Sequence, residues 1–352
     1  MLLSVLILLG ITALLIPPLL GFMNTGLKVV QSQELKTRQL YAAEAGVEDA
    51  LWRIQNNVTG SDSVYECPAL NINNNSVNAN ISKISPDTYK IVSEAVFNAD
   101  NSRKTTIESY LEILDLSVFT EGAITSPGSV DIQPNGNIEG TVTSPYIWIQ
   151  GNPLKTYITD PVEAPVSGWP SATEAAKIAE YYKKQVDTAS PYSAALIDVS
   201  QADQRGPLYV YNDSVSQFFL TGPGLVEGTI YVAGNLELGG SGNLDIGGNT
   251  IFVEGNITSH PQLTLRGTGS IIALGNISFQ PNSSSNEFIF LMAVTGSVNF
   301  QPTGDFVGAV AGNIEVNLQP NCCLQWVSPP GALNLPGVES NLIGEIKTWT
   351  IK

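Results

Sequence analysis

The chain has few of the residues that metal and redox sites need. Its 352 residues include three cysteines, Cys67, Cys322 and Cys323, and one histidine, His260. No C-x-x-C pair and no Cys/His ligand spacing occurs, so the sequence argues against a zinc site and indicates no cofactor. An oxidising compartment would allow one disulfide, either from Cys67 to Cys322 or Cys323 or between the two adjacent cysteines, and the sequence does not choose among these.

Charge is also scarce, and most of it is acidic. Charged residues make up 14% of the chain, with 16 basic against 32 acidic side chains and a formal net charge of −16. Affinity for nucleic acid depends on Lys and Arg, so this composition argues against a nucleic-acid partner. An acidic, self-repelling surface suits a soluble head outside the cell.

Catalytic motifs are missing as well. The sequence contains no G-x-S-x-G, no P-loop and no H-E-x-x-H motif, and a Ser/His/Asp triad would have to use His260. Acidic residues are scattered over the C-terminal half, where Asp245 and Glu254 could be neighbours. Because a paired-carboxylate mechanism needs a defined separation, scattered acids do not support one. We therefore expect a protein that is not an enzyme.

The N-terminus carries a membrane-length apolar segment. Residues 1–27 have no formal charge and residues 1–23 are mostly apolar, and about 20 apolar residues cross the hydrocarbon core. A secretory signal would begin with basic residues and end in a small-residue cleavage site, and neither is present, so we expect the numbering to start near a processed N-terminus. Prolines and glycines within residues 17–26 favour a weak or extended stretch there in an assembled state.

An amphipathic helix follows directly. Its predicted apolar stripe consists of Leu40, Ala43, Val47, Ala50, Leu51 and Ile54. Glu34 with Arg38 and Asp49 with Arg53 form i,i+4 pairs of opposite charge. The stripe predicts that residues 40–54 pack on the chain's own domain.

The same segment carries a family resemblance. Residues 42–50 read A-A-E-A-G-V-E-D-A. With the apolar segment before them, residues 1–56 resemble the N-terminal stem of type IV pilin-like proteins with an A-A-E-A-G-x-E-x-A signature. The resemblance implies a helix that lies in the membrane before assembly and in the core of a filament afterwards. Most type IV pilins keep a glutamate at the fifth mature position, where this chain has Val5 if Met1 is the mature terminus.

The resemblance also implies assembly residues and partners. We assign filament assembly to Met1, Leu2, Leu3, Val5, Leu6, Leu8, Leu9, Leu14, Leu15, Pro17, Pro18, Phe22, Lys36 and Glu44. The expected partners are further copies of the chain in a helical homopolymer, with the pilus assembly machinery and the inner or cytoplasmic membrane before assembly. The expected location is a cell-surface filament outside the cell.

Residues 57–119 predict a small antiparallel β head. Three β-prone runs, residues 77–84, 88–97 and 104–116, are separated by turn-forming residues rich in Pro, Asp, Asn and Ser. We expect a meander that lies over the C-terminal half of the stem helix.

The C-terminal part contains a repeat of about 20 residues. Gly-Asn recurs at Gly234, Gly255, Gly275 and Gly312, and Gln-Pro corners recur at Gln133, Gln280, Gln301 and Gln319. Glycine and asparagine tolerate the left-handed conformations that corners use. We interpret residues 120–151 and 206–328 as one right-handed parallel β-solenoid; a β-sandwich is the alternative. One predicted inward column is Ile230, Ile251, Ile271 and Ile289; the other is Leu236, Ile257, Ile277 and Val298.

These parts give an α+β fold with three domains. They are a pilin stem helix over residues 1–56, a β head over 57–119 and a solenoid domain over 120–352. An insertion over residues 152–205 carries a predicted helix, residues 172–187. Asn-x-Ser/Thr sequons at Asn57, Asn74, Asn80 and Asn282 would allow glycans on an extracellular filament, whereas those at Asn256 and Asn276 predict structural turns.

Two functional hypotheses follow. The first is a structural subunit of a type IV pilus-like filament that displays the solenoid outward, with adhesion to an unknown glycan or cell ligand as a role open to it. The alternative is a membrane-anchored surface protein whose solenoid binds or cleaves polysaccharide.

Overall fold

The structure is a computed structural model that divides the chain into two compact units. It describes residues 2–55, 64–85, 88–98, 104–151, 157–240, 242–280, 287–329, 333–336 and 343–351, without the side chains of residues 2–15, 17, 55, 85, 112–114, 157, 343–349 and 351. The stem unit comprises Met1–Glu112 and Gly344–Lys352, and the solenoid unit comprises Ile113–Ile343.

The stem unit is built on one long helix, α1 (Leu2–Gln55). The two predicted ion pairs are present, with Arg38 Nη2 2.6 Å from Glu34 Oε1 and Arg53 Nε 2.7 Å from Asp49 Oδ2. In this single chain α1 is unbroken through residues 17–26. A proline in a helix interior removes one backbone hydrogen bond and crowds the carbonyl four residues earlier, so the weak stretch stays a prediction for the assembled state.

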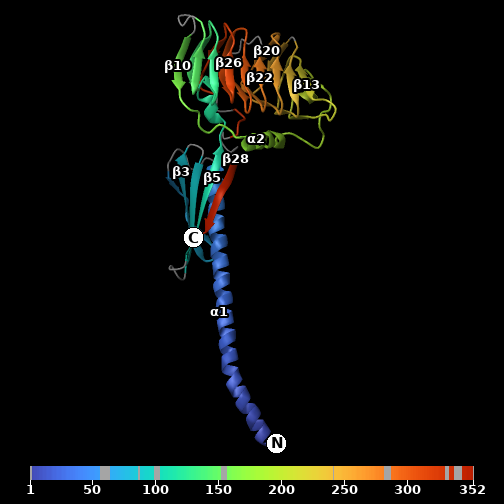
Figure 1. The fold of residues 1–352 in the computed structure, drawn as a ribbon. Coiled ribbons are helices and arrows are strands. Elements are labelled where there is room, and N and C mark those ends of the chain that lie inside the picture. Colours follow the sequence, from blue (N-terminus) through green and yellow to red (C-terminus); the bar gives the residue numbers. More distant parts are fainter. Residues whose placement is uncertain are drawn as a thin grey trace. The chain divides into compact units, whose positions relative to one another are not determined.

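An antiparallel sheet packs on the second half of α1 (Figure 1). Its order is β1-β3-β4-β5-β28, with β2 on β3. The bounds are β1 (Val64–Glu66), β2 (Leu70–Ile72), β3 (Asn75–Ser85), β4 (Thr88–Phe97), β5 (Lys104–Leu114) and β28 (Ile343–Ile351). β3, β4 and β5 pair antiparallel as the turn chemistry predicts. β28 was not predicted: it comes from the C-terminal end of the chain, which the sequence analysis had included in the solenoid domain.

Small residues bring α1 close to this sheet. Ala42, Ala43, Val47, Ala50 and Ile54 are at most 3% exposed. A Cβ on Gly46 would lie 2.3 Å from Ser93 Oγ and 2.6 Å from Val77 Cγ1, so only glycine fits. The predicted stripe is confirmed at its centre, but it also takes in Ala42 and Gly46, while Leu40 and Leu51 are half-buried.

The solenoid unit is a parallel β-solenoid with three sheets. The ten-stranded sheet contains β10 (Tyr157–Glu163), β8 (Asn137–Ser144), β27 (Cys323–Gln325), β25 (Asp305–Gly312), β23 (Ile289–Ala293), β21 (Gly269–Ala273), β18 (Thr250–Val253), β15 (Ile230–Val232) and β12 (Leu208–Val210), with β6 (Ile124–Thr125) beside β25 and β8. The nine-stranded sheet contains β11 (Leu196–Asp198), β13 (Gln217–Thr221), β16 (Asn235–Leu238), β19 (Ile257–Ser259), β22 (Ile277–Phe279), β24 (Val298–Phe300), β26 (Glu315–Leu318), β7 (Ser129–Ile132) and β9 (Tyr146–Ile149). The three-stranded sheet contains β14 (Gly224–Leu225), β17 (Gly242–Asp245) and β20 (Leu263–Arg266), and the 3-10 helices are η1 (Ser117–Thr120) and η2 (Ala202–Gln204).

Strand pairing decides between the solenoid and the sandwich. The pairs formed between strands of these three sheets are parallel, for example β15 with β18 and β16 with β19. A sandwich would pair its strands antiparallel. The parallel solenoid is therefore confirmed, and its right hand stays a prediction.

The chain does not wind through the solenoid in sequence order. β6 to β10 lie at one end of the stack, whereas β11 and β12 lie at the other. From there the coils return until β26 pairs with β7 and β27 pairs with β8. Figure 1 shows β10 and β13 toward opposite ends of the stack, with β22 and β20 between them. The predicted insertion over residues 152–205 therefore also supplies two strands, β10 and β11, to the sheets.

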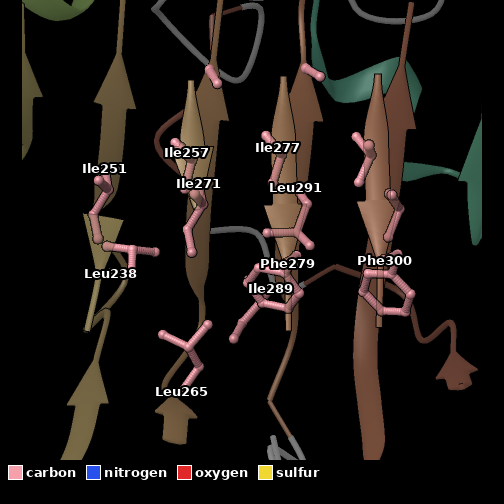
Figure 2. Close-up of a cluster of buried hydrophobic side chains, with 14 of the residues drawn as sticks. Leu238, Ile251, Ile257, Leu265, Ile271, Ile277, Phe279, Ile289, Leu291 and Phe300 are labelled. Atoms are coloured by element: carbon pink, nitrogen blue, oxygen red, sulfur yellow. The ribbon is translucent and has the colours of Figure 1, made fainter. Parts of the chain in front are cut away.

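Inward columns of branched side chains form the core. Ile230, Ile251 and Ile271 stack in register, but the next member is Leu291 rather than Ile289, which pairs with Gly269. Figure 2 shows Ile251, Ile271 and Leu291 on successive strands. The second predicted column is confirmed and continues beyond the residues expected: Leu236, Ile257, Ile277, Val298, Val316 and Val130.

Helix α2 (Ala172–Lys184) covers the outer face of the ten-stranded sheet. It begins with a capping box in which Ser171 and Glu174 bond each other's backbone. The Tyr182 ring stacks on Phe252 at 4.9 Å, and its hydroxyl donates to the Asn334 carbonyl at 3.1 Å. The predicted helix is confirmed, although it ends at Lys184.

The Gly-Asn repeat builds an asparagine ladder. Asn235 Oδ1 accepts from the backbone and side-chain amides of Asn256, and Asn256 Oδ1 does the same for Asn276, with backbone distances of 2.8 Å. A Cβ on Gly255 or Gly275 would lie 2.5 Å from the Asn Oδ1 of the preceding coil. These glycines are therefore needed for space and not for a left-handed φ. Left-handed φ values occur instead at Asn135 and Asn321, in the Gln-Pro-Asn corners.

Candidate assembly helix and amide face

The first candidate site is the N-terminal part of α1, which the sheet leaves bare. Among the side chains of α1 that the structure describes, Ile16 and those from Pro18 onward, the first buried one is Gln39. Before it stand eight large apolar side chains that are each at least 51% exposed: Ile16, Leu19, Leu20, Phe22, Met23, Leu27, Val29 and Val30. Figure 1 shows this part of α1 extending away from β3 and β5. At 1.5 Å per residue, the 37 residues before Gln39 that belong to α1 would span about 56 Å.

Part of the predicted assembly set falls on this bare segment. Pro18 and Phe22 are exposed, and Phe22 is 85% exposed. Met1 lies outside the described residues, and so do the side chains of Leu2, Leu3, Val5, Leu6, Leu8, Leu9, Leu14, Leu15 and Pro17. Among the helical residues whose side chains are described, no segment is both long and apolar enough to cross a membrane.

The two charged assembly candidates differ. Lys36 is exposed before the helix reaches the sheet, whereas Glu44 is half-buried within the packed segment. Sequence reasoning missed two exposed aromatic residues, Tyr41 at 60% and Trp52 at 55%. They are eleven residues apart, close to three helical turns, so they lie on one side of α1. That spacing is visible in the sequence.

Polar and amide side chains cover part of the nine-stranded sheet. One outward column on β22, β24, β26, β7 and β9 is Ser278, Asn299, Asn317, Asp131 and Trp148, aligned residue to residue. A second column, two residues further along each coil, is Gln280, Gln301, Gln319, Gln133 and Gln150. We call these ten residues the amide face.

Hydrogen bonds order the amide face, both between its two columns and within one of them. Gln319 Nε2 donates to Asn299 Oδ1 at 2.9 Å and to Asn317 Oδ1 at 3.2 Å. Gln150 Nε2 donates to Asp131 Oδ2 at 2.7 Å, and Gln280 Nε2 donates to Gln301 Oε1 at 3.2 Å. Trp148 ends its column on strand β9 and is 63% exposed, as is Tyr146 on the same strand.

Asp245 and Glu254, the two acidic residues that the sequence suggested as neighbours, lie at different sheets of the solenoid. Asp245 lies on β17 of the three-stranded sheet, where Oδ1 accepts from the Gly247 amide at 2.9 Å. Glu254 follows β18 of the ten-stranded sheet and accepts the Tyr231 hydroxyl. His260 Nε2 lies 2.6 Å from Glu237 Oε1 on the solenoid surface. Within the described residues, no group of three or more His, Cys, Asp or Glu side chains could hold a metal ion.

A hollow of about 340 Å³ lies near η1. Phe119 and Val166 line it together with Thr125, Thr141 and Thr143, and Glu121 is the one carboxylate among its lining residues.

The three cysteines are free thiols in this structure. Cys67 and Cys322 are buried, Cys323 is half-buried, and all three are free. Burial raises the pKa of Cys322 to about 12 and also raises the pKa of Cys67. The predicted disulfide stays untested.

The sequons differ in their surroundings. Asn74 and Asn80 are exposed, at the turn before β3 and on β3 itself. Asn57 and Asn282 lie outside the described residues. Asn256 and Asn276 belong to the ladder, which confirms their structural role.

Comparisons with known proteins give only distant likenesses. No known family model matches the chain, and no curated protein matches its sequence. Among solved structures, the chain is similar to the competence-associated pilin ComZ from Thermus thermophilus, with a TM-score of 0.30 and 10% identity over 90% of this chain and 97% of that one. It is also similar to an ice-binding protein from the Antarctic ascomycete Antarctomyces psychrotrophicus, with a TM-score of 0.24 and 13% identity over 60% of this chain and 98% of that one. TM-scores this low carry no argument about fold or function.

Proposed function

We propose that this chain is a structural subunit of an extracellular, type IV pilus-like filament. The observation that carries the proposal is the bare apolar part of α1, which is joined to a well-packed stem sheet and followed in sequence by a solenoid. In the filament, the α1 segments of many copies bury one another, and the acidic heads face the medium. Before assembly, α1 resides in the cytoplasmic membrane.

The energetic case rests on the exposed side chains of α1. Full burial of a large apolar side chain contributes about 1.5–3 kcal/mol. The eight exposed side chains from Ile16 to Val30 would therefore contribute about 12–24 kcal/mol. Association costs roughly 4–15 kcal/mol in lost translational and rotational freedom. The two ranges overlap, so burial offsets much or all of that cost for a segment that would otherwise face water. For a helix that leaves the membrane, close packing against neighbouring stems takes the place of this contribution.

The extent of the apolar surface supports a filament over a simple membrane anchor. A span of the hydrocarbon core needs about 20 residues. Exposed apolar side chains continue to Val30, and Tyr41 and Trp52 lie beside the part of α1 that packs on the sheet. Neighbouring subunits in a filament would cover that longer surface.

The test is electron microscopy of sheared cell-surface material from cells that express the chain with its assembly machinery. Leu20→Glu places a charge on the bare helix and should abolish fibres while the head stays folded. Leu225→Glu makes the same change at an exposed position of the solenoid and should leave fibres intact. Normal fibres from Leu20→Glu would refute the proposal. So would a wild-type chain that forms no fibres and sediments as a monomer in detergent, which is the expectation for the anchored alternative.

The proposal includes the absence of catalysis. Purified full-length chain should release no sugars from acidic or neutral polysaccharides. Turnover that disappears on mutation of Asp245 or Glu254 would favour the enzyme alternative.

A further inference from the structure

We propose that the amide face binds uncharged, hydroxyl-rich polysaccharide, with Trp148 as a stacking platform at its end. This inference does not depend on filament assembly, because its residues all belong to the solenoid unit.

The first support is the chemistry of the face. Side-chain amides present both a donor and an acceptor, and a sugar hydroxyl does the same, so the two groups match. Seven of the ten residues are amides, one is a serine, and none is Lys or Arg. A protein partner would need an apolar centre, which these columns lack. An anionic polymer would be repelled by Asp131 and by the net charge of −16.

The second support is preorganisation. The hydrogen bonds between the columns use the Oδ1 atoms of Asn299 and Asn317 and the Nε2 groups of their Gln neighbours. In the described part of the solenoid, the Nδ2 groups of these two asparagines and the Oε1 atom of Gln319 have no hydrogen-bond partner. Each of these three groups is held in place because the other polar atom of the same side-chain amide makes a hydrogen bond. Because the side chains are already ordered, binding a ligand costs less conformational entropy.

The third support is the geometry. Adjacent strands are about 4.8 Å apart, so the five coils of the face provide a ladder roughly 19 Å long. The ladder runs along the stack and ends at Trp148, where Tyr146 stands on the same strand. Both aromatic side chains are 63% exposed. A polymer chain lying along the ladder would place a sugar ring against the Trp148 indole, whose apolar face suits the C–H groups of the ring.

The experiment uses the full-length chain in detergent, pelleted with insoluble cellulose, chitin or β-1,3-glucan, and with alginate gel as the anionic comparison. We expect wild type to bind at least one neutral polymer and not alginate. Trp148→Ala should weaken that binding at least tenfold, and Trp148→Phe should restore most of it. Asn317→Ala combined with Gln319→Ala should weaken it roughly threefold to tenfold, as expected for lost neutral hydrogen bonds.

Asn243→Ala is the matched control. Asn243 is an exposed amide on β17 of the three-stranded sheet, so its loss should leave binding unchanged. Three results would overturn the inference: no retention of wild type on any neutral polymer, equal retention of wild type and Trp148→Ala, or retention on alginate alone. A change in oligomeric state on Trp148→Ala, without glycan binding by wild type, would instead assign β9 to contacts between copies. Circular dichroism checks that each variant folds, and fibre formation is scored separately.

Discussion

Replacement of Gly275 by alanine tests the origin of the Gly-Asn repeat. The new Cβ would lie 2.5 Å from Asn256 Oδ1 and 2.9 Å from the Gly255 carbonyl oxygen. Asn256 would have to move, and its Oδ1 would then release the backbone and side-chain amides of Asn276. The substitution therefore combines a steric clash with the loss of two hydrogen bonds.

The expected magnitude follows from three contributions. Forcing extra atoms into a packed site costs about 1–3 kcal/mol, and each lost hydrogen bond costs about 0.5–1.5 kcal/mol. Replacing glycine by alanine offsets about 0.4–1 kcal/mol by lowering the entropy of the unfolded chain. We expect a net loss of roughly 1–6 kcal/mol for Gly275→Ala, with a centre at about 3 kcal/mol.

The assay is guanidinium unfolding of the full-length chain, followed by circular dichroism, with hydrogen exchange at the Asn276 amide as a local readout. Gly239→Ala is the control, because its Cβ would meet only His260 Cδ2, at 3.5 Å. In the double variant with Asn256→Ala, the Oδ1 atom that the new Cβ would meet is absent, and both changes lose the same hydrogen bonds to Asn276, so its loss should be smaller than the sum of the two single losses. An additive double variant, or a Gly275→Ala no less stable than Gly239→Ala, would refute the steric explanation.

Three further predictions concern the packed parts of the chain. Ile251→Ala should cost about 2–5 kcal/mol in chemical unfolding, because this side chain is fully buried in an inward column, and a cost under 1 kcal/mol would contradict the column. Gly46→Ala should lower the stability of the stem unit by about 1–3 kcal/mol through the steric clash, and its higher helix propensity should offset about 1 kcal/mol of that loss. Combining it with Ser93→Ala, which removes the hydroxyl that the new Cβ would meet, should recover part of the remaining loss. The folded-state pKa of Cys322 is raised to about 12 from 9.0, so its contribution to stability is complete below pH 9 and should fall as the pH rises toward 12. A Cys322→Ser variant should flatten that part of the pH profile, and an unchanged profile would show that the thiol does not contribute.

The sequence predicted the features that depend on periodicity. The apolar stripe with a period of 3.6 residues predicted the buried side of α1. Alternation of apolar and polar residues predicted β3, β4 and β5, and the repeat of about 20 residues predicted the parallel solenoid. The column from Leu236 to Val298 was predicted residue by residue. In each case the apolar positions of the sequence pattern are the positions that the structure buries.

The error at Ile289 has a clear physical cause. A shift of two residues along a strand leaves the same face pointing inward, so alternation cannot choose between Ile289 and Leu291. Only the strand pairing with β21 fixes the register. The hydrophobic pattern of the segment Ile289–Ala293 is equally compatible with both.

Pairing between strands far apart in the sequence could not be predicted either, because the hydrophobic pattern of a strand does not identify its partner. Nothing in residues 343–351 distinguishes a solenoid strand from the fifth strand of the stem sheet. The amide face was also missed, although four of its five glutamines were noted as corner residues. Their common column depends on β7 and β9 joining the stack beside β26, and the sequence does not show that pairing. The bare helix could be predicted because an uncharged apolar run is a local property.

The crossing between the two ends of the solenoid has to span the whole stack. The chain leaves β10 at Glu163 and reaches β11 at Leu196, at the far end of nine stacked strands. Eight strand spacings amount to roughly 38 Å. Helix α2 supplies 13 residues, or about 20 Å, and irregular chain supplies the rest. In an open solenoid a coil can be duplicated freely, whereas here each added coil lengthens the path that α2 and its flanking segments must bridge. Fully extended, the 19 residues of the crossing outside α2 would reach about 63 Å. The crossing is therefore longer than the present stack requires, and duplication of a coil would not need a longer helix.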